Sequence, residues 1–93
     1  MMTTVVNIRV VGKNFDVYIG RPSKWGNPFK IGRDADGTLW SRDAVILLYD
    51  SWVQQEITEG RLDVSELRGK VLGCYCDPLP CHGHVLARLA DAA

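Results

Sequence analysis

The chain has 93 residues, 46% of them hydrophobic, and its 11 basic and 11 acidic residues balance to a net charge of zero. This size and hydrophobic content predict one small packed domain over residues 1–93 and exclude general disorder. The absence of excess positive charge argues against a protein that holds nucleic acid mainly by charge. No apolar run approaches the ~20 residues that span a bilayer. The N-terminus lacks a secretory signal, so we expect no membrane partner and a cytoplasmic location, in a bacterial cell or a phage-infected host.

Two alternating apolar segments open the chain. The first carries Val6, Ile8 and Val10 on one face, and the second carries Phe15, Val17 and Ile19. Because Gly12-Lys13-Asn14 between them has the composition of a turn, we predict an N-terminal β-hairpin. The following segment, Gly20–Phe29, contains two prolines and two glycines, which exclude a helix or a regular strand. A second exposed turn is expected at Asp34–Gly37.

A central helix is predicted from about Ser41, which can cap its first N–H groups, to Gly60. Its apolar residues recur at helical spacing, and the stripe comprises Val45, Leu48, Tyr49, Trp52, Val53 and Ile57. Asp63 then resembles the cap of a short helical turn that runs through Leu67. Trp40 and Trp52 are both assigned to the core.

The continuous apolar run Val71–Cys76 predicts a buried central strand, because it is short and follows Gly69. Period-two geometry places Leu72, Cys74 and Cys76 on one face of that strand. Two prolines then enforce an elbow, and a last helix is expected from Cys81 or His82, with a buried stripe that comprises Val85, Leu86, Leu89 and Ala90. The order of elements predicts a small α/β or α+β fold.

The elbow Cys74–His84 holds all three cysteines and both histidines of the chain. In open α/β sheets, ligands bind beyond the carboxyl ends of the strands. A helix that begins here would direct the backbone N–H groups of His82, Gly83 and His84 toward that space, where they favour an anion. Gly83 would also let a ligand approach the backbone closely. This reading predicts a ligand site, to which Cys76 also contributes.

The same elbow offers a nucleophile. A thiol of Cys81 at a helix N-terminus beside His82 would be stabilised as its thiolate. If the protein is an enzyme, Cys81 is the candidate nucleophile and His82 or Asp77 handles the proton, in a group transfer or hydrolysis on a nucleotide-like substrate.

Two other interpretations of the elbow stay open. Cys74, Cys76, Cys81 and His84, with His82 as a fifth donor, exceed the four ligands that zinc takes, although their spacing is not that of a standard finger. This alternative predicts a zinc-stabilised interaction module that contacts nucleic acid or protein. The last interpretation is structural, in which Cys74 is a small buried hydrophobe.

The loop Gly20–Phe29 has the content of a site for a nucleotide-like ligand. Its candidate binding residues are Arg21, Ser23, Lys24, Trp25 and Asn27. The two cations would hold phosphate, the indole would stack on a base, and the amide would read the edge of the base. In the structural alternative, the aromatic residues of this loop only cover the core. A third possibility is an accessory protein whose exposed loop binds a partner.

Two stretches of the chain carry a resemblance to a known family. They are Tyr18–Phe29, read as YIGRPSKWGNPF, and Leu67–Gly83, read as LRGKVLGCYCDPLPCHG. Together they resemble the bacterial and phage "domain of unknown function" family 4326 over nearly the whole chain. Members of that family usually carry Trp at the position of Tyr75 and Asp at that of His84, which weakens a zinc site that depends on His84. The resemblance implies a bacterial or phage source and assigns no activity.

The leading functional hypothesis is therefore binding, processing or sequestration of a nucleotide or a nucleoside-derived phosphate, between the loop 20–29 and the elbow 76–84. It requires no cofactor, whereas the alternative requires zinc. A binder of this kind commonly completes its pocket by forming a homo-oligomer, so a homo-oligomer is one of the expected partners.

Overall fold

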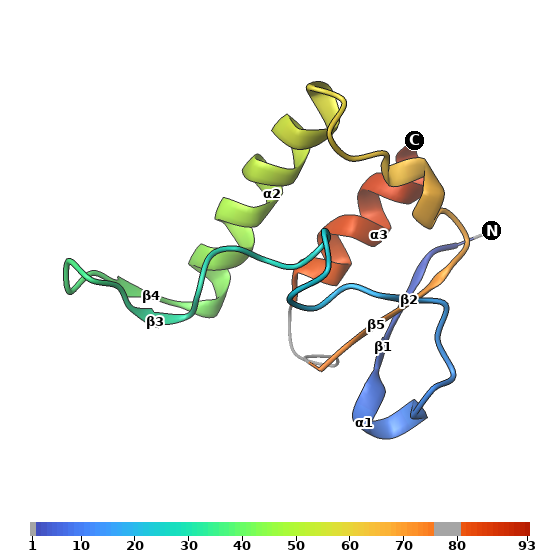
Figure 1. Ribbon diagram of the computed structural model, residues 1–93, viewed down its shortest axis with the longest axis horizontal. Helices are drawn as coiled ribbons and strands as arrows, with labels where there is room; N and C mark the ends of the chain where they lie inside the picture. The colour runs from blue at the N-terminus through green and yellow to red at the C-terminus, as the bar shows by residue number, and fades with distance from the viewer. Residues whose placement is uncertain (1, 76–80) are drawn as a thin grey trace.

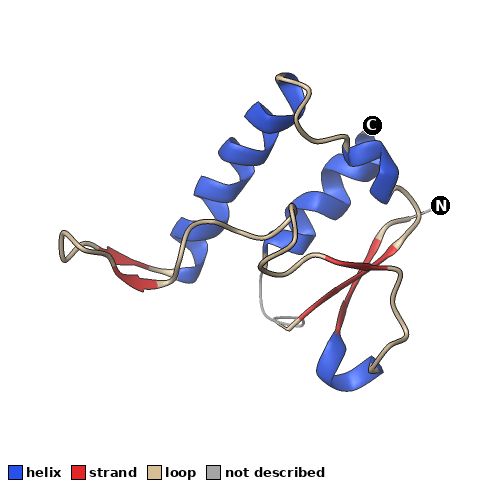
Figure 2. Ribbon diagram, in the orientation of Figure 1, coloured by secondary structure: helices blue, strands red, loops and turns tan. Residues whose placement is uncertain are grey.

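The computed structural model describes residues 2–75 and 81–93. The elements run in the order β1 (Thr4–Asn7), α1 (Ile8–Val11), β2 (Val17–Tyr18), β3 (Gly32–Arg33), β4 (Leu39–Trp40), α2 (Arg42–Thr58), the 3-10 turn η1 (Val64–Leu67), β5 (Val71–Cys74) and α3 (His82–Ala92). Helices and strands mix in a small α/β fold, as predicted (Figures 1 and 2). None of the helices in the described part of the chain is long and apolar enough to cross a membrane.

The main sheet has three strands in the order β1-β5-β2, and both outer strands run parallel to β5. The predicted N-terminal hairpin is therefore corrected: β1 and β2 do not pair with each other, because β5 lies between them. The chain leaves β1 through the single helical turn α1. Asn7 caps this turn, because the Asn7 side chain accepts the Arg9 N–H at 2.9 Å. An apolar strand such as β5, with a neighbour on each edge, satisfies all its backbone groups, which a two-stranded hairpin would not do.

The central strand β5 is buried on both faces. Leu72 and Cys74 lie in the core with 0% and 2% exposure, which confirms that they share its inner face. On the opposite face, a Cβ added at Gly73 would come within 2.8 Å of the Phe15 ring and 3.1 Å of Ile8, so these side chains cover that face. Cys76 lies outside the described residues.

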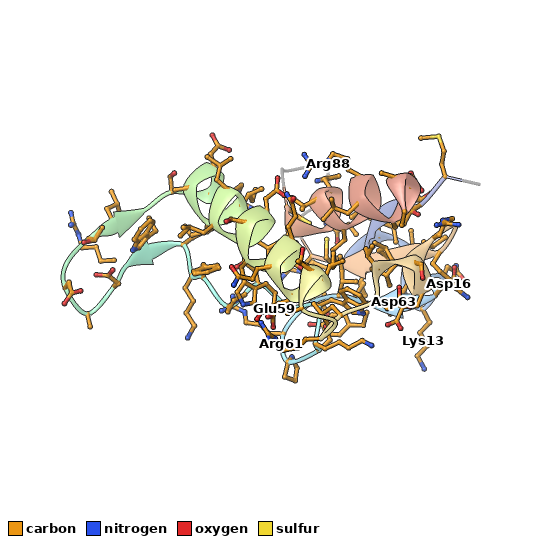
Figure 3. The ribbon with its side chains drawn as sticks, turned by 90° about the horizontal axis from the view of Figure 1, so that it is seen from above. Lys13, Asp16, Glu59, Arg61, Asp63 and Arg88 are labelled. Atoms are coloured by element: carbon orange, nitrogen blue, oxygen red, sulfur yellow. The ribbon has the colours of Figure 1, made fainter. Side chains whose placement is uncertain are left out.

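Two helices build the rest of the core. In Figure 1, α3 lies between the sheet and α2, and contacts of α3 with both β1 and α2 agree with this arrangement. The side chains of α2 that are buried are Val45, Tyr49 and Val53, while Trp52 and Ile57 pack against the core, as predicted. Leu48, also predicted for this stripe, is half-buried and does not belong to the core. A salt bridge of 2.8 Å between Arg88 and Asp50 joins the outer surfaces of the two helices; Arg88 is labelled in Figure 3.

The boundaries of α2 follow the predicted signals. The side chain of Ser41 accepts the Ala44 N–H at 3.1 Å, and after Thr58 the chain leaves the helix at Gly60, whose φ of 80° suits glycine.

The strands β3 and β4 form a short antiparallel arm that projects from the start of α2 (Figure 1). Its tip is the predicted turn, in which the Gly37 N–H donates to the Asp34 carbonyl at 3.0 Å. The assignment of Trp40 to the core is corrected, because Trp40 is half-buried on this arm and its indole N–H donates to the Asp34 carboxylate at 2.9 Å. The sequence pattern could not show that the residues before the helix fold away from the core.

Candidate functional site

A cleft of about 510 Å³ opens at the carboxyl ends of the parallel strands. It is bounded by the ends of β2 and β5, the loop after β2, and the first turns of α2 and α3. Its lining residues are Tyr18, Gly20, Arg21, Asn27, Phe29, Lys30, Ile31, Arg42, Val45, Ile46, Cys74, Tyr75, Cys81 and His82. The structure thus brings the predicted loop and the described ends of the predicted elbow to one cavity, at the sheet edge where α/β folds bind ligands.

The loop that forms one wall is held in place by α2. The Tyr49 hydroxyl, buried on α2, donates to the Trp25 carbonyl at 2.7 Å. The Asn27 side chain donates to the Val45 carbonyl at 3.2 Å and accepts the Phe29 N–H at 2.8 Å. Burial strongly raises the pKa of Tyr49, so this phenol stays protonated as a donor. The loop is therefore a fixed wall of the cleft, positioned by bonds at two successive turns of the helix.

The charged groups that line the cleft are cationic. Arg21 and Lys30 come from the loop and Arg42 from the first turn of α2. Among the described residues, no carboxylate lines the cleft, and neither Arg21 nor Lys30 makes an ion pair. In the described part of the chain, ion pairs form on the exposed surface, such as the one between Glu59 and Arg61 (Figure 3). Among the described residues, the charged side chains that line the cleft are thus all cationic, which favours an anionic ligand.

Aromatic residues line the same cleft as these cations. Tyr18 and Tyr75, at the ends of the neighbouring strands β2 and β5, meet edge to face with ring centroids 6.4 Å apart. The ring of Tyr75 is half exposed, and the Arg9 guanidinium lies 5.5 Å from its centroid. Phe29 also lines the cleft, from the loop after β2. An exposed ring next to cations is a surface on which a flat heterocycle can stack.

Two thiols lie at the inner end of the cleft, where β5 ends and α3 begins. The Sγ atoms of Cys74 and Cys81 are 3.3 Å apart, and both residues line the cleft although their side chains are 2% and 3% exposed. Cys81 is the N-cap of α3, and its sulfur accepts the Gly83 N–H at 3.1 Å. That N–H and the positive end of the helix dipole both favour the thiolate form of Cys81.

His82 lies between the sheet and α2. Its Nε2 donates to the Ile19 carbonyl at 2.7 Å, and its ring packs edge to face on Tyr49 at 5.0 Å. Burial lowers the pKa of His82 below the ordinary 6.5, although the bond to Ile19 acts in the opposite direction. The residue is therefore neutral near pH 7, with Nδ1 as its basic nitrogen.

This lowered pKa predicts a pH dependence of stability. As the pH falls below about 6.5, the unfolded chain binds a proton at residue 82 before the folded protein does, so His82 makes the free energy of unfolding decrease until the pH passes the folded pKa. The variant His82→Gln keeps an N–H donor but does not titrate. We expect urea denaturation to show wild type losing stability relative to this variant between about pH 7.5 and 5. If the free energies of unfolding of the two proteins change with pH in parallel, His82 does not have a lowered pKa. A pKa of His82 at or above 6.5 by NMR would lead to the same conclusion.

Several predicted loop residues lie away from the cleft. Trp25 is in the core with 2% exposure, so its ring is not presented to a ligand. Lys24 pairs with Glu66 at 2.6 Å, and Ser23 belongs to a turn in which its N–H donates to the Gly20 carbonyl. Of the predicted loop residues, Arg21 and Asn27 line the cleft.

The start of α3 also differs from the expectation. The N–H groups of Gly83 and His84 donate to the sulfur and the carbonyl of Cys81, so the helix caps itself instead of offering these two donors to an anion. His84 is exposed, and its Nδ1 accepts the Cys81 N–H at 3.2 Å. The predicted residues Cys76 and Asp77 lie outside the described residues. Within the described ranges, no group of three His, Cys, Asp or Glu side chains is placed to hold a metal ion.

Among the polar side chains that line the cleft, the sequence analysis gave no role to Tyr18, Lys30, Arg42 and Tyr75. The two tyrosines become neighbours only because β2 and β5 pair in parallel, and the hairpin prediction concealed that pairing. Arg42 had a usable signal, because the first turn of a helix that follows a long loop often faces the same space as the loop.

Comparison with known proteins gives a family match and uncharacterized viral relatives. A family model described as "Domain of unknown function (DUF4326)" matches residues 6–92. The "Uncharacterized 12.4 kDa protein in nrdA-td intergenic region" of Enterobacteria phage T4 is 39% identical, over 89% of this chain and 77% of the relative. "Uncharacterized protein R718" of Acanthamoeba polyphaga mimivirus is 31% identical, over 95% of this chain and 81% of the relative. No solved structure matches the chain.

Proposed function

The chain belongs to the DUF4326 family, and we propose that this member binds a nucleotide or a nucleoside-derived phosphate in the cleft at the carboxyl end of its sheet. The observation that carries the proposal is the pairing of cations with aromatic rings in one cavity, in a protein whose net charge is zero. Arg21, Lys30 and Arg42 are suited to phosphate, and guanidinium groups bind its oxygens in pairs.

The aromatic contribution comes from the strand ends and not from Trp25. Tyr75 offers a half-exposed ring at one side of the cleft, and the volume of about 510 Å³ lies within the usual range of small-molecule sites. In this proposal, the base stacks near Tyr75 and the phosphate binds near Arg21. Asn27 has both ends of its amide engaged with backbone, so in this proposal it shapes the wall and does not read the base.

The test is isothermal titration of the purified protein with the common ribonucleoside and deoxyribonucleoside mono-, di- and triphosphates, and with the corresponding nucleosides. We expect at least one nucleotide to bind and the corresponding nucleoside to bind more weakly. Added salt should lower the affinity of the nucleotide more than that of the nucleoside. Arg21→Gln should lower the affinity by about tenfold or more, because a hydrogen bond to a charged group contributes about 1.5–3 kcal/mol.

Lys13→Gln is the matched control, since it removes the same charge from an exposed position outside the cleft (Figure 3). It should bind as wild type does. Equal losses in the two variants, or no binding of any phosphate at millimolar concentration, would contradict the proposal. Native mass spectrometry of freshly purified protein adds a second check, because it reports a co-purified nucleotide and the number of chains in the assembly.

The zinc-stabilised module remains a separate prediction, since its ligand set includes Cys76, outside the described residues. One zinc ion per chain in the same native spectrum, together with unfolding by a chelator, would favour that module over the nucleotide site.

A further inference from the structure

We propose that Cys74 and Cys81 form a redox-active dithiol, which a small disulfide such as glutathione disulfide oxidises through the cleft. The proposal rests on the positions of the two sulfurs and does not depend on the nucleotide proposed above. Their separation of 3.3 Å is already a contact distance, so a bond between them requires only a small approach of the end of β5 and the start of α3.

The two thiols are not equivalent. Cys81 is the N-cap of an 11-residue helix, and its sulfur accepts a backbone N–H from Gly83 at 3.1 Å. Both features stabilise a thiolate, which is the attacking species in thiol–disulfide exchange. Cys74 sits on the sheet at the end of β5, with its sulfur directed at Cys81. This asymmetry assigns Cys81 as the attacking thiol and Cys74 as the resolving thiol.

Access is the second requirement. Both cysteines are buried, with 2% and 3% exposure, and both line the cleft. The cleft is therefore the route by which an oxidant reaches the sulfurs. Its cations Arg21, Lys30 and Arg42 also favour an anionic oxidant, and glutathione disulfide carries carboxylates.

The exchange proceeds in two balanced steps. The Cys81 thiolate attacks one sulfur of glutathione disulfide, forms a mixed disulfide and releases one glutathione thiolate. The Cys74 thiol loses its proton to that released thiolate and attacks Cys81 Sγ, which forms the Cys74–Cys81 bond and expels the second glutathione. Starting from the Cys81 thiolate, the protein loses two electrons and one proton, and one glutathione disulfide becomes one glutathione thiol and one glutathione thiolate.

The experiment begins from Cys76→Ser, which leaves only the two thiols in question. This variant is incubated with excess glutathione disulfide, quenched with acid, alkylated and mapped by peptide mass spectrometry. We expect both thiols to be lost together, a peptide cross-link between Cys74 and Cys81, and recovery of both thiols with dithiothreitol. If both thiols can still be alkylated after prolonged incubation with glutathione disulfide, the proposal is overturned.

Two double variants then test which cysteine is the attacking thiol and which is the resolving thiol. The double variant Cys74→Ser/Cys76→Ser should stop at a mixed disulfide, with one glutathionyl group on Cys81. The matched variant Cys76→Ser/Cys81→Ser should acquire glutathione on Cys74 at least tenfold more slowly. Faster modification of Cys74 would overturn the assignment of Cys81 as the attacking thiol. Circular dichroism verifies that each variant is folded, and the cross-link in Cys76→Ser decides the existence of the pair if either double variant fails to fold.

Discussion

Replacing Leu72 with alanine is expected to lower the free energy of unfolding by about 2–5 kcal/mol, the range for leucine truncations in a packed core. Leu72 has 0% exposure and lies on β5, which pairs with both β1 and β2. Because a domain of this size has a stability of roughly 5–15 kcal/mol, the variant loses a large share of its total. Urea denaturation followed by tryptophan fluorescence measures the change.

Leu47→Ala provides the control for this prediction. Leu47 has the same side chain but is 70% exposed on α2, so its truncation should change the stability by less than about 0.5 kcal/mol. A loss at Leu72 no larger than the loss at Leu47 would show that β5 is not the buried centre of the sheet.

Replacing Gly83 with alanine should destabilise the protein by about 1–3 kcal/mol, the usual cost of overpacking a core. A glycine-to-alanine change inside a helix normally stabilises it by up to about 1 kcal/mol, so the expected sign is opposite to that of helix propensity. The reason is the packing of α3 on the sheet: a Cβ at position 83 would lie 2.7 Å from Cδ1 of Ile19 and 3.1 Å from Cγ1 of Val5. Gly83 thus allows α3 to pack closely on the sheet. From the sequence, this glycine was expected to allow a ligand to approach the backbone.

A double-mutant cycle isolates this contact. Ile19→Val removes the Cδ1 atom that the new methyl group would meet, so Gly83→Ala should cost less in that background than in wild type. Thermal or urea unfolding of the four proteins gives the coupling. Additive losses, or stabilisation by Gly83→Ala alone, would mean that α3 does not approach the sheet this closely.

Local patterns in the sequence were sufficient for the elements whose signals lie within a few residues. The apolar stripe of α2 and its cap at Ser41 predicted the helix Arg42–Thr58, because helical periodicity and capping are local properties. The run from Val71 likewise predicted the buried strand β5. The elbow and the loop could be recognised as one candidate site, since strand ends and helix starts are adjacent in α/β folds.

Tertiary structure alone decided which strands pair and which side chains meet. The alternation of apolar and polar residues in the first 20 residues fits a hairpin and also fits two strands that flank β5. The pattern cannot distinguish the two arrangements, because a pairing partner distant in sequence leaves no periodic signal. Trp25 has the composition of a stacking residue, yet it lies in the core because its loop folds back onto α2. The contact of Cys74 with Cys81 also required the fold, since the distance between two sulfurs depends on how the helix is placed against the strand.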